Sequence, residues 1–153
     1  MINALPSVGT DPVVGLKTLC DQHPGKVVFT TSMGLEDQAL TDLIARNELP
    51  VRVVTLDTGR LFQETYDLMD RTRSMYPGLE LETYFPAAES LEAFVNTQGM
   101  SSIFKSVESR KACCGIRKID PLHRALEGAE VWVTGLRSEQ SDNRAGLAPV
   151  SYT

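Results

Sequence analysis

The sequence predicts an α/β protein built on a doubly wound, mostly parallel sheet. Short runs rich in β-branched residues, such as 27–31 and 51–56, alternate along the chain with stretches of helical periodicity. The chain has 153 residues, of which 42% are hydrophobic and 23% charged, and these values suit a single globular domain with one core. Because strands that alternate with helices need crossover connections, we expect helices on both faces of the sheet.

The first predicted helix carries signals at both ends. Asp11 followed by Pro12 places an N-cap residue before a proline at the first helical position. Pro24-Gly25 ends the helix soon after residue 22. Apolar residues recur within it at helical spacing, and Cys20 is one of them. We therefore expect Cys20 in the hydrophobic core.

The remaining elements follow in regular alternation, separated by turn residues such as Pro77-Gly78. The expected strands cover residues 27–31, 51–56, 79–85 and 130–134. The expected helices cover 36–46, 61–75, 90–96 and, less regularly, 103–126 with an interruption near Pro121.

Composition excludes several classes of protein. A net charge of −5 argues against a general nucleic-acid binder. No apolar run approaches the roughly 18–20 residues that span a bilayer, so we expect no membrane partner. The first residues lack a signal peptide, and three cysteines do not make a secreted disulfide framework, so we expect a cytoplasmic protein. The sequence leaves the oligomeric state open, with a homo-oligomer among the options.

The basic residues are concentrated late in the chain. Residues 1–103 hold seven lysines and arginines against fourteen acidic residues, whereas the remaining fifty hold eight against six. A chain that is acidic overall and gathers cations in one segment is expected to use them locally. A solvated helix face is the alternative for any single one of them.

Three loops should meet at one edge of the sheet, because ligands of open parallel sheets bind outside the carboxyl ends of the strands. They are 32–37, 57–60 and 135–144. In the first, Ser32 and Gly34 allow a tight turn that can present backbone N–H groups to an anion at a helix N-terminus. The loop matches neither the P-loop nor the dinucleotide-binding pattern. Glu36 and Asp37 also suit the dipole of the next helix.

The other two loops combine turn formers with arginine. Asp57 or Thr58 can cap the next helix, and Gly59 supplies a turn conformation, but capping does not explain Arg60, which could pair with an anion. In the 135–144 loop two arginines are interleaved with Gln and Ser, and their forked donors suit phosphate or sulfate. A flexible polar loop is the alternative there.

The adjacent pair Cys113-Cys114 is the strongest chemical signal. Free cysteines commonly just pack in the core. A single metal ion gains little from adjacent ligands, whereas a multi-iron cluster lets neighbouring thiolates reach different irons. Either site needs about four ligands, but Cys20 is far away in sequence and His23 and His123 lack ligand spacing. The metal site, if these residues form one, is incomplete within this sequence.

Taken together, the motifs resemble the assimilatory sulfonucleotide reductases of the iron–sulfur type that act on adenosine 5′-phosphosulfate. The matching stretches are FTTSMGLEDQ (29–38), LDTGRLFQETY (56–66), CCGIRKIDPL (113–122) and TGLRSEQSDNR (134–144). The resemblance implies a sheet like that of the adenine nucleotide α-hydrolases. The Cys-Cys pair is also the mark of the non-3′-phosphorylated substrate in that family.

The resemblance also implies roles for individual residues. Loop 32–37 would surround the phosphosulfate, and Leu56 with the following turn would lie near the adenosine. Cys113 and Cys114 would be two of the four ligands of a [4Fe–4S] cluster. Neither of them would be the nucleophilic cysteine. The substrate-binding residues implied are Ser32, Gly34, Leu35, Glu36, Asp37, Leu56, Asp57, Thr58, Gly59, Arg60, Lys118, Arg137, Gln140, Ser141 and Arg144.

One departure from the family follows. Members continue with a Cys-x-x-Cys pair and a terminal nucleophilic cysteine, which residues 1–153 lack, so we expect one sulfonucleotide-binding domain, C-terminally truncated. The complete protein would reduce adenosine 5′-phosphosulfate to sulfite and AMP with thioredoxin or an equivalent dithiol. This chain alone would bind nucleotide without completing the reaction.

Three alternatives stay open. One is a reductase of the 3′-phosphorylated substrate. Another is an adenylating enzyme of the ATP pyrophosphatase group, although that group prefers Ser-Gly-Gly-x-Asp-Ser where this chain has Ser32-Met-Gly-Leu-Glu-Asp37. The last is a non-catalytic nucleotide-binding or thiol-sensing module that uses Cys113-Cys114.

Overall fold

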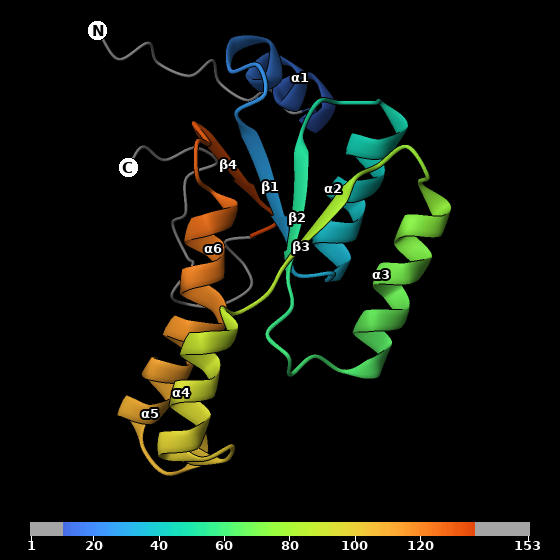
Figure 1. The fold of residues 1–153 in the computed structure, drawn as a ribbon. Helices are drawn as coiled ribbons and strands as arrows, with labels where there is room; N and C mark the ends of the chain where they lie inside the picture. Colours follow the sequence, from blue (N-terminus) through green and yellow to red (C-terminus); the bar gives the residue numbers. More distant parts are fainter. Residues whose placement is uncertain (1–10, 137–153) are drawn as a thin grey trace, which may run out of the picture.

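A computed structural model of the protein describes residues 11–136 as a parallel sheet flanked by helices (Figure 1). The sheet has four strands in the order β3-β2-β1-β4, and every neighbouring pair is parallel. The strands are β1 (Val27–Thr31), β2 (Arg52–Leu56), β3 (Leu81–Tyr84) and β4 (Val131–Thr134). The predicted α/β class is confirmed. The order reverses beside β1, so the crevice expected at a topological switch point lies between β1 and β4.

Six α-helices and two short helical turns accompany the strands in the described part of the chain, and all but α1 lie between strands. The helices are α1 (Pro12–Gln22), α2 (Leu35–Arg46), α3 (Gln63–Met75), α4 (Ala88–Gln98), α5 (Val107–Cys114) and α6 (Asp120–Ala125). A 3₁₀ turn, η1 (Ser102–Phe104), precedes α5, and a π-helical turn, η2 (Gly115–Ile119), joins α5 to α6. Each predicted element is present. The expected 103–126 helix is instead divided among η1, α5, η2 and α6.

The larger core lies between the sheet and helices α1, α2 and α3. Val27 and Phe29 of β1 and Val53 of β2 point to this face, and each is at most 1% exposed. The Asp11 carboxylate accepts the N–H of Val13 at 2.9 Å and so caps α1 as predicted. Cys20, predicted in the core, is buried in this cluster.

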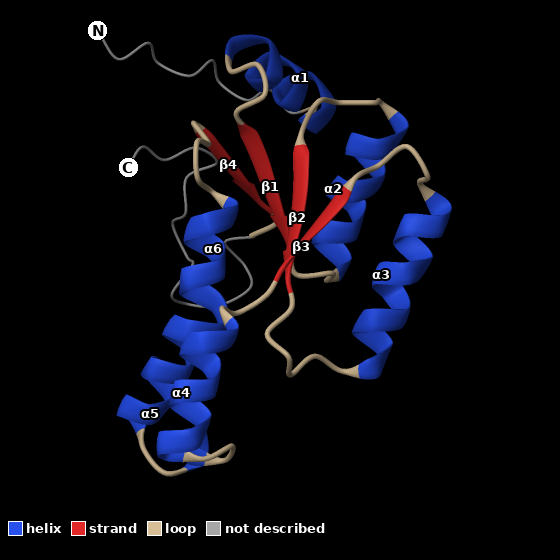
Figure 2. Ribbon diagram, in the orientation of Figure 1, coloured by secondary structure: helices blue, strands red, loops and turns tan. Residues whose placement is uncertain are grey.

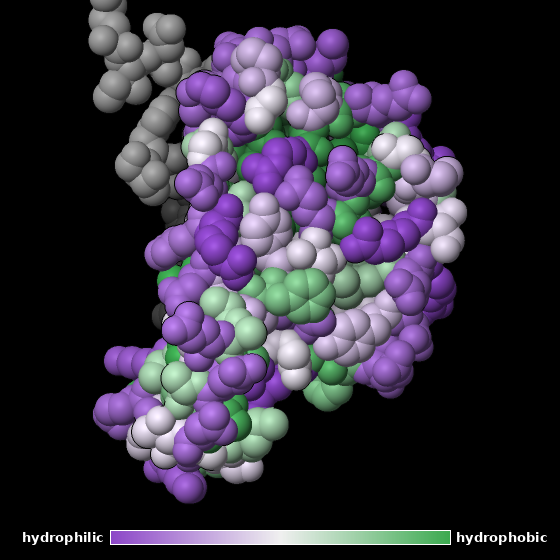
Figure 3. All heavy atoms as spheres, in the orientation of Figure 1, coloured by the Kyte–Doolittle hydropathy of each residue, from purple (hydrophilic) through white to green (hydrophobic). Residues whose placement is uncertain are grey.

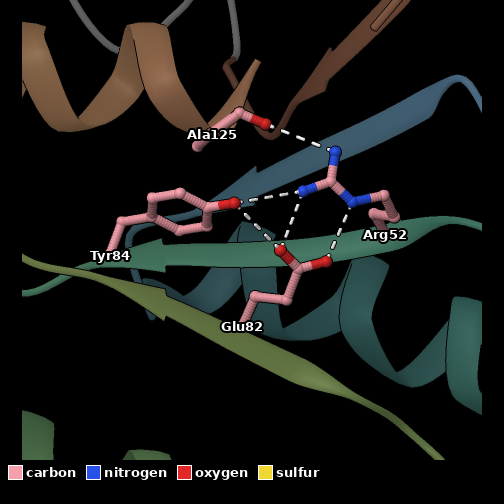
Figure 4. A network of polar contacts seen from close by, with 4 residues as sticks. All are labelled: Arg52, Glu82, Tyr84 and Ala125. Carbon is pink, nitrogen blue, oxygen red and sulfur yellow. Dashed lines mark hydrogen bonds and ion pairs between the residues drawn. The ribbon is translucent and has the colours of Figure 1, made fainter. Parts of the chain in front are cut away.

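A smaller core lies on the other face, under α6, where Ala125 packs against Val28 and Val54. A polar network ties this helix to the sheet (Figure 4). Arg52 donates two hydrogen bonds to the Glu82 carboxylate, at 2.9 and 2.8 Å, and a third reaches the carbonyl oxygen of Ala125 at 3.4 Å. Figures 1 and 2 show α2 and α3 on one side of the sheet and α6 on the other, as a doubly wound fold requires.

Helices α4 and α5 lie beyond the carboxyl ends of the strands, at the opposite end of the molecule from α1 (Figure 1). Several large apolar side chains are exposed, and apolar surface is visible in the lower half of the face that Figure 3 shows. They include Leu35, Phe62 and Phe104, which follow β1, β2 and α4 respectively. Among the described residues, no helix is long and apolar enough to cross a membrane.

Candidate functional site

The loop after β1 is closed by its own aspartate. A single carboxylate oxygen of Asp37, Oδ2, accepts hydrogen bonds from the Ser32 N–H at 2.5 Å and from the Ser32 hydroxyl at 2.6 Å. Asp37 is buried, although it stands in the first turn of α2, where a carboxylate can also favour the helix dipole. Its main partner is thus the strand-end serine, a contact that the sequence did not predict.

The backbone of this loop turns tightly, as expected from Ser32 and Gly34. Met33 has a φ of 65°, in the left-handed region that non-glycine residues rarely adopt. Its N–H donates to the Thr31 hydroxyl at 3.0 Å, which supports the turn. Gly34 is the N-cap of α2, and a Cβ there would lie 3.3 Å from the Ser32 hydroxyl oxygen. The turn leaves the N-terminus of α2 at the carboxyl edge of the sheet.

The next two predicted residues, Leu35 and Glu36, open α2. The Leu35 side chain is 83% exposed, so it makes little contact with the chain itself. Glu36 is partly buried in the first turn, where its charge suits the helix dipole as the sequence analysis proposed.

The turn after β2 has a hydrogen-bond network of its own. Oδ1 of Asp57 accepts the Gly59 N–H at 2.7 Å and the Tyr66 hydroxyl at 2.9 Å. The Thr58 hydroxyl oxygen accepts the N–H of Arg60 at 3.2 Å. Gly59 has a φ of 69°, which explains the glycine. Asp57 and Thr58 are both buried in spite of their polarity.

The expectation that Asp57 or Thr58 caps the next helix is wrong. Helix α3 begins at Gln63, two residues later than predicted, and its N-cap, Phe62, makes no side-chain cap. The Asp57 carboxylate is instead committed to the turn and to Tyr66. That hydrogen bond, together with burial, raises the pKa of the Tyr66 hydroxyl.

Arg60 reaches across to another segment. Its guanidinium donates to the carbonyl oxygen of Met100, just before η1, so it ties the turn after β2 to the helical segment that carries the cysteines. The partner seen in the structure is thus a backbone carbonyl, and the anion expected from the sequence stays a prediction. The Arg60 side chain also borders a cavity, described below.

The third loop begins directly against the first. Gly135 follows β4, and a Cβ at this position would come within 2.0 Å of the Asp37 carboxylate. The juxtaposition places the start of the 135–144 loop at the switch point between β1 and β4. The predicted binding residues Arg137, Gln140, Ser141 and Arg144 lie outside the described residues.

The two adjacent cysteines end α5 and differ in environment. Cys113 is buried and Cys114 is exposed, as expected for neighbours on a helix. Both nevertheless border one cavity of about 370 Å³, which we call the cysteine cavity. Cys20 belongs to α1, at the far end of the molecule in Figure 1, so it cannot join them.

The cysteine cavity brings together five residues predicted from two separate stretches of the sequence, 56–66 and 113–122. They are Thr58, Arg60, Cys113, Cys114 and Lys118. Loop 32–37 and Leu56 do not border it, so the predicted site divides into this cavity and the Ser32–Asp37–Gly135 contact. Both groups lie at the carboxyl edge of the sheet.

The other residues that border the cavity were not predicted from the sequence; they are Leu61, Ile103, Phe104, Arg110 and Arg117. Two of them are arginines. Together with Arg60 and Lys118 they make four cationic side chains, and none of the acidic side chains in residues 11–136 borders the cavity. The late excess of basic residues was the available signal, but it did not indicate which of them face inward. The charge of the cavity therefore favours an anion.

The described residues form no cluster of three or more His, Cys, Asp or Glu side chains that could bind a metal. Cys113 and Cys114 thus supply two thiols only. An iron–sulfur cluster carried by thiolates is anionic, and the four cations around this pair suit such a group. The two thiols match two of the four cluster ligands that the resemblance implies, and the positive charge of the cavity suits an anionic cluster.

Fold and site together define an α/β protein whose polar loops and cysteine pair gather at the carboxyl edge of a parallel sheet. Residues 26–153 match the phosphoadenosine phosphosulfate reductase domain. The chain therefore belongs to this family.

Several named proteins are similar to the chain. An adenosine 5′-phosphosulfate reductase of Agrobacterium fabrum is 50% identical over 121 residues, which are 79% of this chain and 46% of the relative. That of Allochromatium vinosum is 47% identical over 145 residues, 95% of this chain and 56% of the relative. The chain thus spans about half the length of the curated relatives it matches.

A solved structure confirms the fold. The phosphoadenylyl-sulfate reductase of Candida auris, in a phosphate complex, superposes with a TM-score of 0.73 at 28% sequence identity. The match covers 87% of this chain and 64% of that one. The sheet and its flanking helices are therefore those of a sulfonucleotide reductase domain.

Proposed function

We propose that this chain is the nucleotide-binding part of an iron–sulfur adenosine 5′-phosphosulfate reductase. The observation that carries the proposal is the cysteine cavity. It joins the adjacent pair Cys113-Cys114 to Thr58, just beyond the carboxyl end of β2, and every charged side chain that borders it in the described part of the chain is a cation. Relatives about 50% identical to the chain are named adenosine 5′-phosphosulfate reductases, which supports this substrate.

In this proposal the adenosine lies near Leu56 and the turn formed by Asp57, Thr58 and Gly59. The phosphosulfate lies between Lys118, which borders the cavity, and the loop after β1 with the N-terminus of α2. Arg137 and Arg144, with Gln140 and Ser141, would complete this anion site from outside the described residues. The role of these cations is to stabilise negative charge that develops on the phosphate.

Cys113 and Cys114 would hold a [4Fe–4S] cluster together with two further ligands of the complete protein. When bound, the cluster would supply a fixed charged group beside the substrate rather than a route for electrons. Arg110, Arg117 and Lys118 border the same cavity and would balance its negative charge. In this assignment neither cysteine of the pair is the nucleophile.

The reaction proposed for the complete, cytoplasmic protein has two steps. A thiolate of another cysteine attacks the terminal sulfur of the phosphosulfate, so that a sulfur–sulfur bond forms and the sulfur–oxygen bond breaks with AMP as leaving group. Thioredoxin or an equivalent dithiol then attacks the cysteine S-sulfonate, supplies two electrons and becomes oxidised as sulfite is released.

Calorimetry of the 153-residue chain with adenosine 5′-phosphosulfate, its 3′-phosphorylated relative and ATP tests the substrate. We expect the first to bind at least about tenfold more tightly than the other two. Preference for the 3′-phosphorylated nucleotide would instead indicate a reductase of that substrate, and tight ATP binding with pyrophosphate release an adenylating enzyme. Absence of nucleotide binding would contradict the proposal.

A pair of lysine variants tests the location. Lys118→Met removes a cation of the cysteine cavity and should weaken nucleotide binding, whereas Lys111→Met removes an exposed lysine of the same helical segment that does not border the cavity. Equal effects of the two substitutions would show that the cavity is not the nucleotide site.

A further inference from the structure

The arginine that follows the cysteine pair has an unusual position for a charged residue. Arg117 stands in the π-helical turn η2 and is only 7% exposed, whereas Lys118 and Ile119 beside it are exposed. Arginine is almost never buried unless it is paired. The environment of this side chain therefore needs an explanation.

The π-helical turn explains how the side chain points inward. Cys113, Arg117, Pro121 and Ala125 are all buried, at intervals of four residues. In an α-helix of 3.6 residues per turn such a stripe would drift by about 40° at each step. A π turn closes i→i+5 hydrogen bonds and holds more residues per turn, so it reduces the drift. Arg117 is thereby kept on the same inner face as Cys113.

The partner of Arg117 is the turn after β2. Its Nη1 donates a hydrogen bond to the carbonyl oxygen of Thr58, 59 residues earlier in the chain. The contact is close, since a Cβ on Gly59 would lie 3.2 Å from the same nitrogen. The guanidinium thus lies against the backbone of this turn.

Several polar groups of the turn are bonded within its own segment, and the N–H of Asp57 donates to the carbonyl oxygen of Tyr84 in β3 at 2.9 Å. The Asp57 carboxylate accepts from Gly59 and Tyr66, and the Thr58 hydroxyl oxygen accepts from Arg60. The Thr58 carbonyl oxygen, in contrast, accepts its hydrogen bond from Arg117 of η2, the turn that follows the cysteine-bearing helix α5. Arg117 therefore holds the carbonyl oxygen of the Thr58–Gly59 peptide, whose N–H is held within the turn by Asp57 Oδ1.

The guanidinium also has unused capacity. Its Nε is buried and lacks a hydrogen-bond partner among the described residues. A buried cation with a neutral carbonyl as its partner is only partly compensated. Since Arg117 borders the cysteine cavity, its remaining charge favours an anion there.

We propose that Arg117 is a positioning residue: from the cysteine-bearing helix it holds the Thr58 carbonyl, and so it sets the conformation of the turn that receives the nucleotide. The inference rests on the proposed nucleotide site but assigns Arg117 an action through Thr58. A merely structural role, in which the arginine only attaches the helix to the sheet, would alter stability without altering the turn or the affinity of the folded protein.

The first measurement is calorimetric titration of AMP into the 153-residue chain and three variants. Arg117→Met removes both charge and donors, and Arg117→Lys keeps the charge but not the forked geometry. The control is Arg124→Met, because Arg124 also donates to a backbone carbonyl, that of Phe85, but does not border the cavity. We expect affinity to fall about tenfold in Arg117→Met, less in Arg117→Lys, and not in Arg124→Met.

The second measurement needs no ligand. Amide hydrogen exchange of Gly59 and Arg60 reports directly on the turn, and we expect about tenfold faster exchange in Arg117→Met than in the wild type or in Arg124→Met. If Arg117→Met does not fold, the same comparison is made with Arg117→Lys.

The two measurements separate a failure of the proposed nucleotide-binding function from a failure of the positioning role of Arg117. If the wild type does not bind AMP, the proposed function fails, and exchange at Gly59 and Arg60 alone decides on Arg117. If the wild type binds AMP but folded Arg117 variants bind it equally well, the positioning role is wrong. Unchanged exchange at the turn would also overturn it.

Discussion

Gly135 lies so close to Asp37 that a Cβ on the glycine would come within 2.0 Å of the carboxylate oxygen Oδ1. The other carboxylate oxygen holds the N–H and the hydroxyl of Ser32. The ends of β1 and β4 are therefore joined through one buried aspartate. This contact lies at the switch point of the sheet, between β1 and β4.

Substitution of Gly135 should disturb this contact. In Gly135→Ala the methyl group would displace the Asp37 carboxylate, and we expect a loss of about 1–3 kcal/mol in the free energy of unfolding. Thermal and urea unfolding measure it. Gly78→Ala is the matched control, since a Cβ there meets nothing within 4 Å, and it should change stability by less than about 0.5 kcal/mol. Equal stability of both variants would mean that Asp37 can move aside freely.

The Arg52–Glu82 pair should make stability depend on pH in the acid range. The Arg52 guanidinium holds the pKa of the Glu82 carboxyl below its ordinary value of 4.5. The stabilisation is thus complete above about pH 4.5 and is lost as pH falls through the lowered pKa. Glu82→Gln should lower stability by about 1–2 kcal/mol near neutral pH, at the low end because both side chains remain partly in solvent.

Urea unfolding between about pH 3 and pH 7 checks this expectation. The difference between Glu82→Gln and wild type should shrink toward the acid end. Glu127→Gln serves as the control, because Glu127 is exposed and its side chain has no partner in the described part of the chain. A pH-independent difference for Glu82→Gln would show that packing, rather than charge, accounts for its effect.

The three cysteines should react with a thiol reagent at different rates. Cys114 is exposed, whereas Cys113 and Cys20 are buried. Burial, and secondarily the charge of Asp21, raises the pKa of the Cys20 thiol and so reduces its reactive thiolate. We expect one fast and two slow reactions in the folded chain. The fast phase should vanish in Cys114→Ser and persist in Cys20→Ser, and its survival in Cys114→Ser would contradict the assigned exposures.

Tyr66 should contribute a pH dependence at the alkaline end. Its hydrogen bond to the Asp57 carboxylate, with burial, raises the pKa of its hydroxyl above 10.0. The stabilisation is therefore complete below pH 10 and is lost as pH rises through the raised pKa. Tyr66→Phe should lose less stability than wild type between about pH 9 and pH 11. A parallel loss in both proteins would show that the bond does not persist in solution.

Local signals were sufficient to predict the elements of the sheet. The cap by Asp11 and the β-branched run 27–31 are short-range patterns, and the structure has them where the sequence placed them. The predicted start of α3 was wrong. Asp57 is typical of helix caps, but its carboxylate accepts hydrogen bonds from Gly59 and Tyr66 instead. A carboxylate has several local donors within reach, and only the folded chain decides among them.

The sequence singled out some of the residues that border the cysteine cavity but not all of them. Lys118 was selected and Arg117 was not, although the structure buries Arg117 and exposes Lys118. Their orientation depends on the π turn, which has no signature in residue type. The contact between Gly135 and Asp37 joins residues about a hundred positions apart, so no local pattern could have indicated it.

The pairing of β1 with β4 has a consequence for biosynthesis. The indole N–H of Trp132 bonds to the Thr30 hydroxyl across 102 residues, and the two strands run in parallel register. As the polypeptide leaves the ribosome, one edge of the apolar strand β1 stays unprotected until residues 131–134 emerge. Such long-range pairing slows folding and leaves a nascent chain prone to aggregation. Protection of both edges of β1 therefore awaits the last described strand.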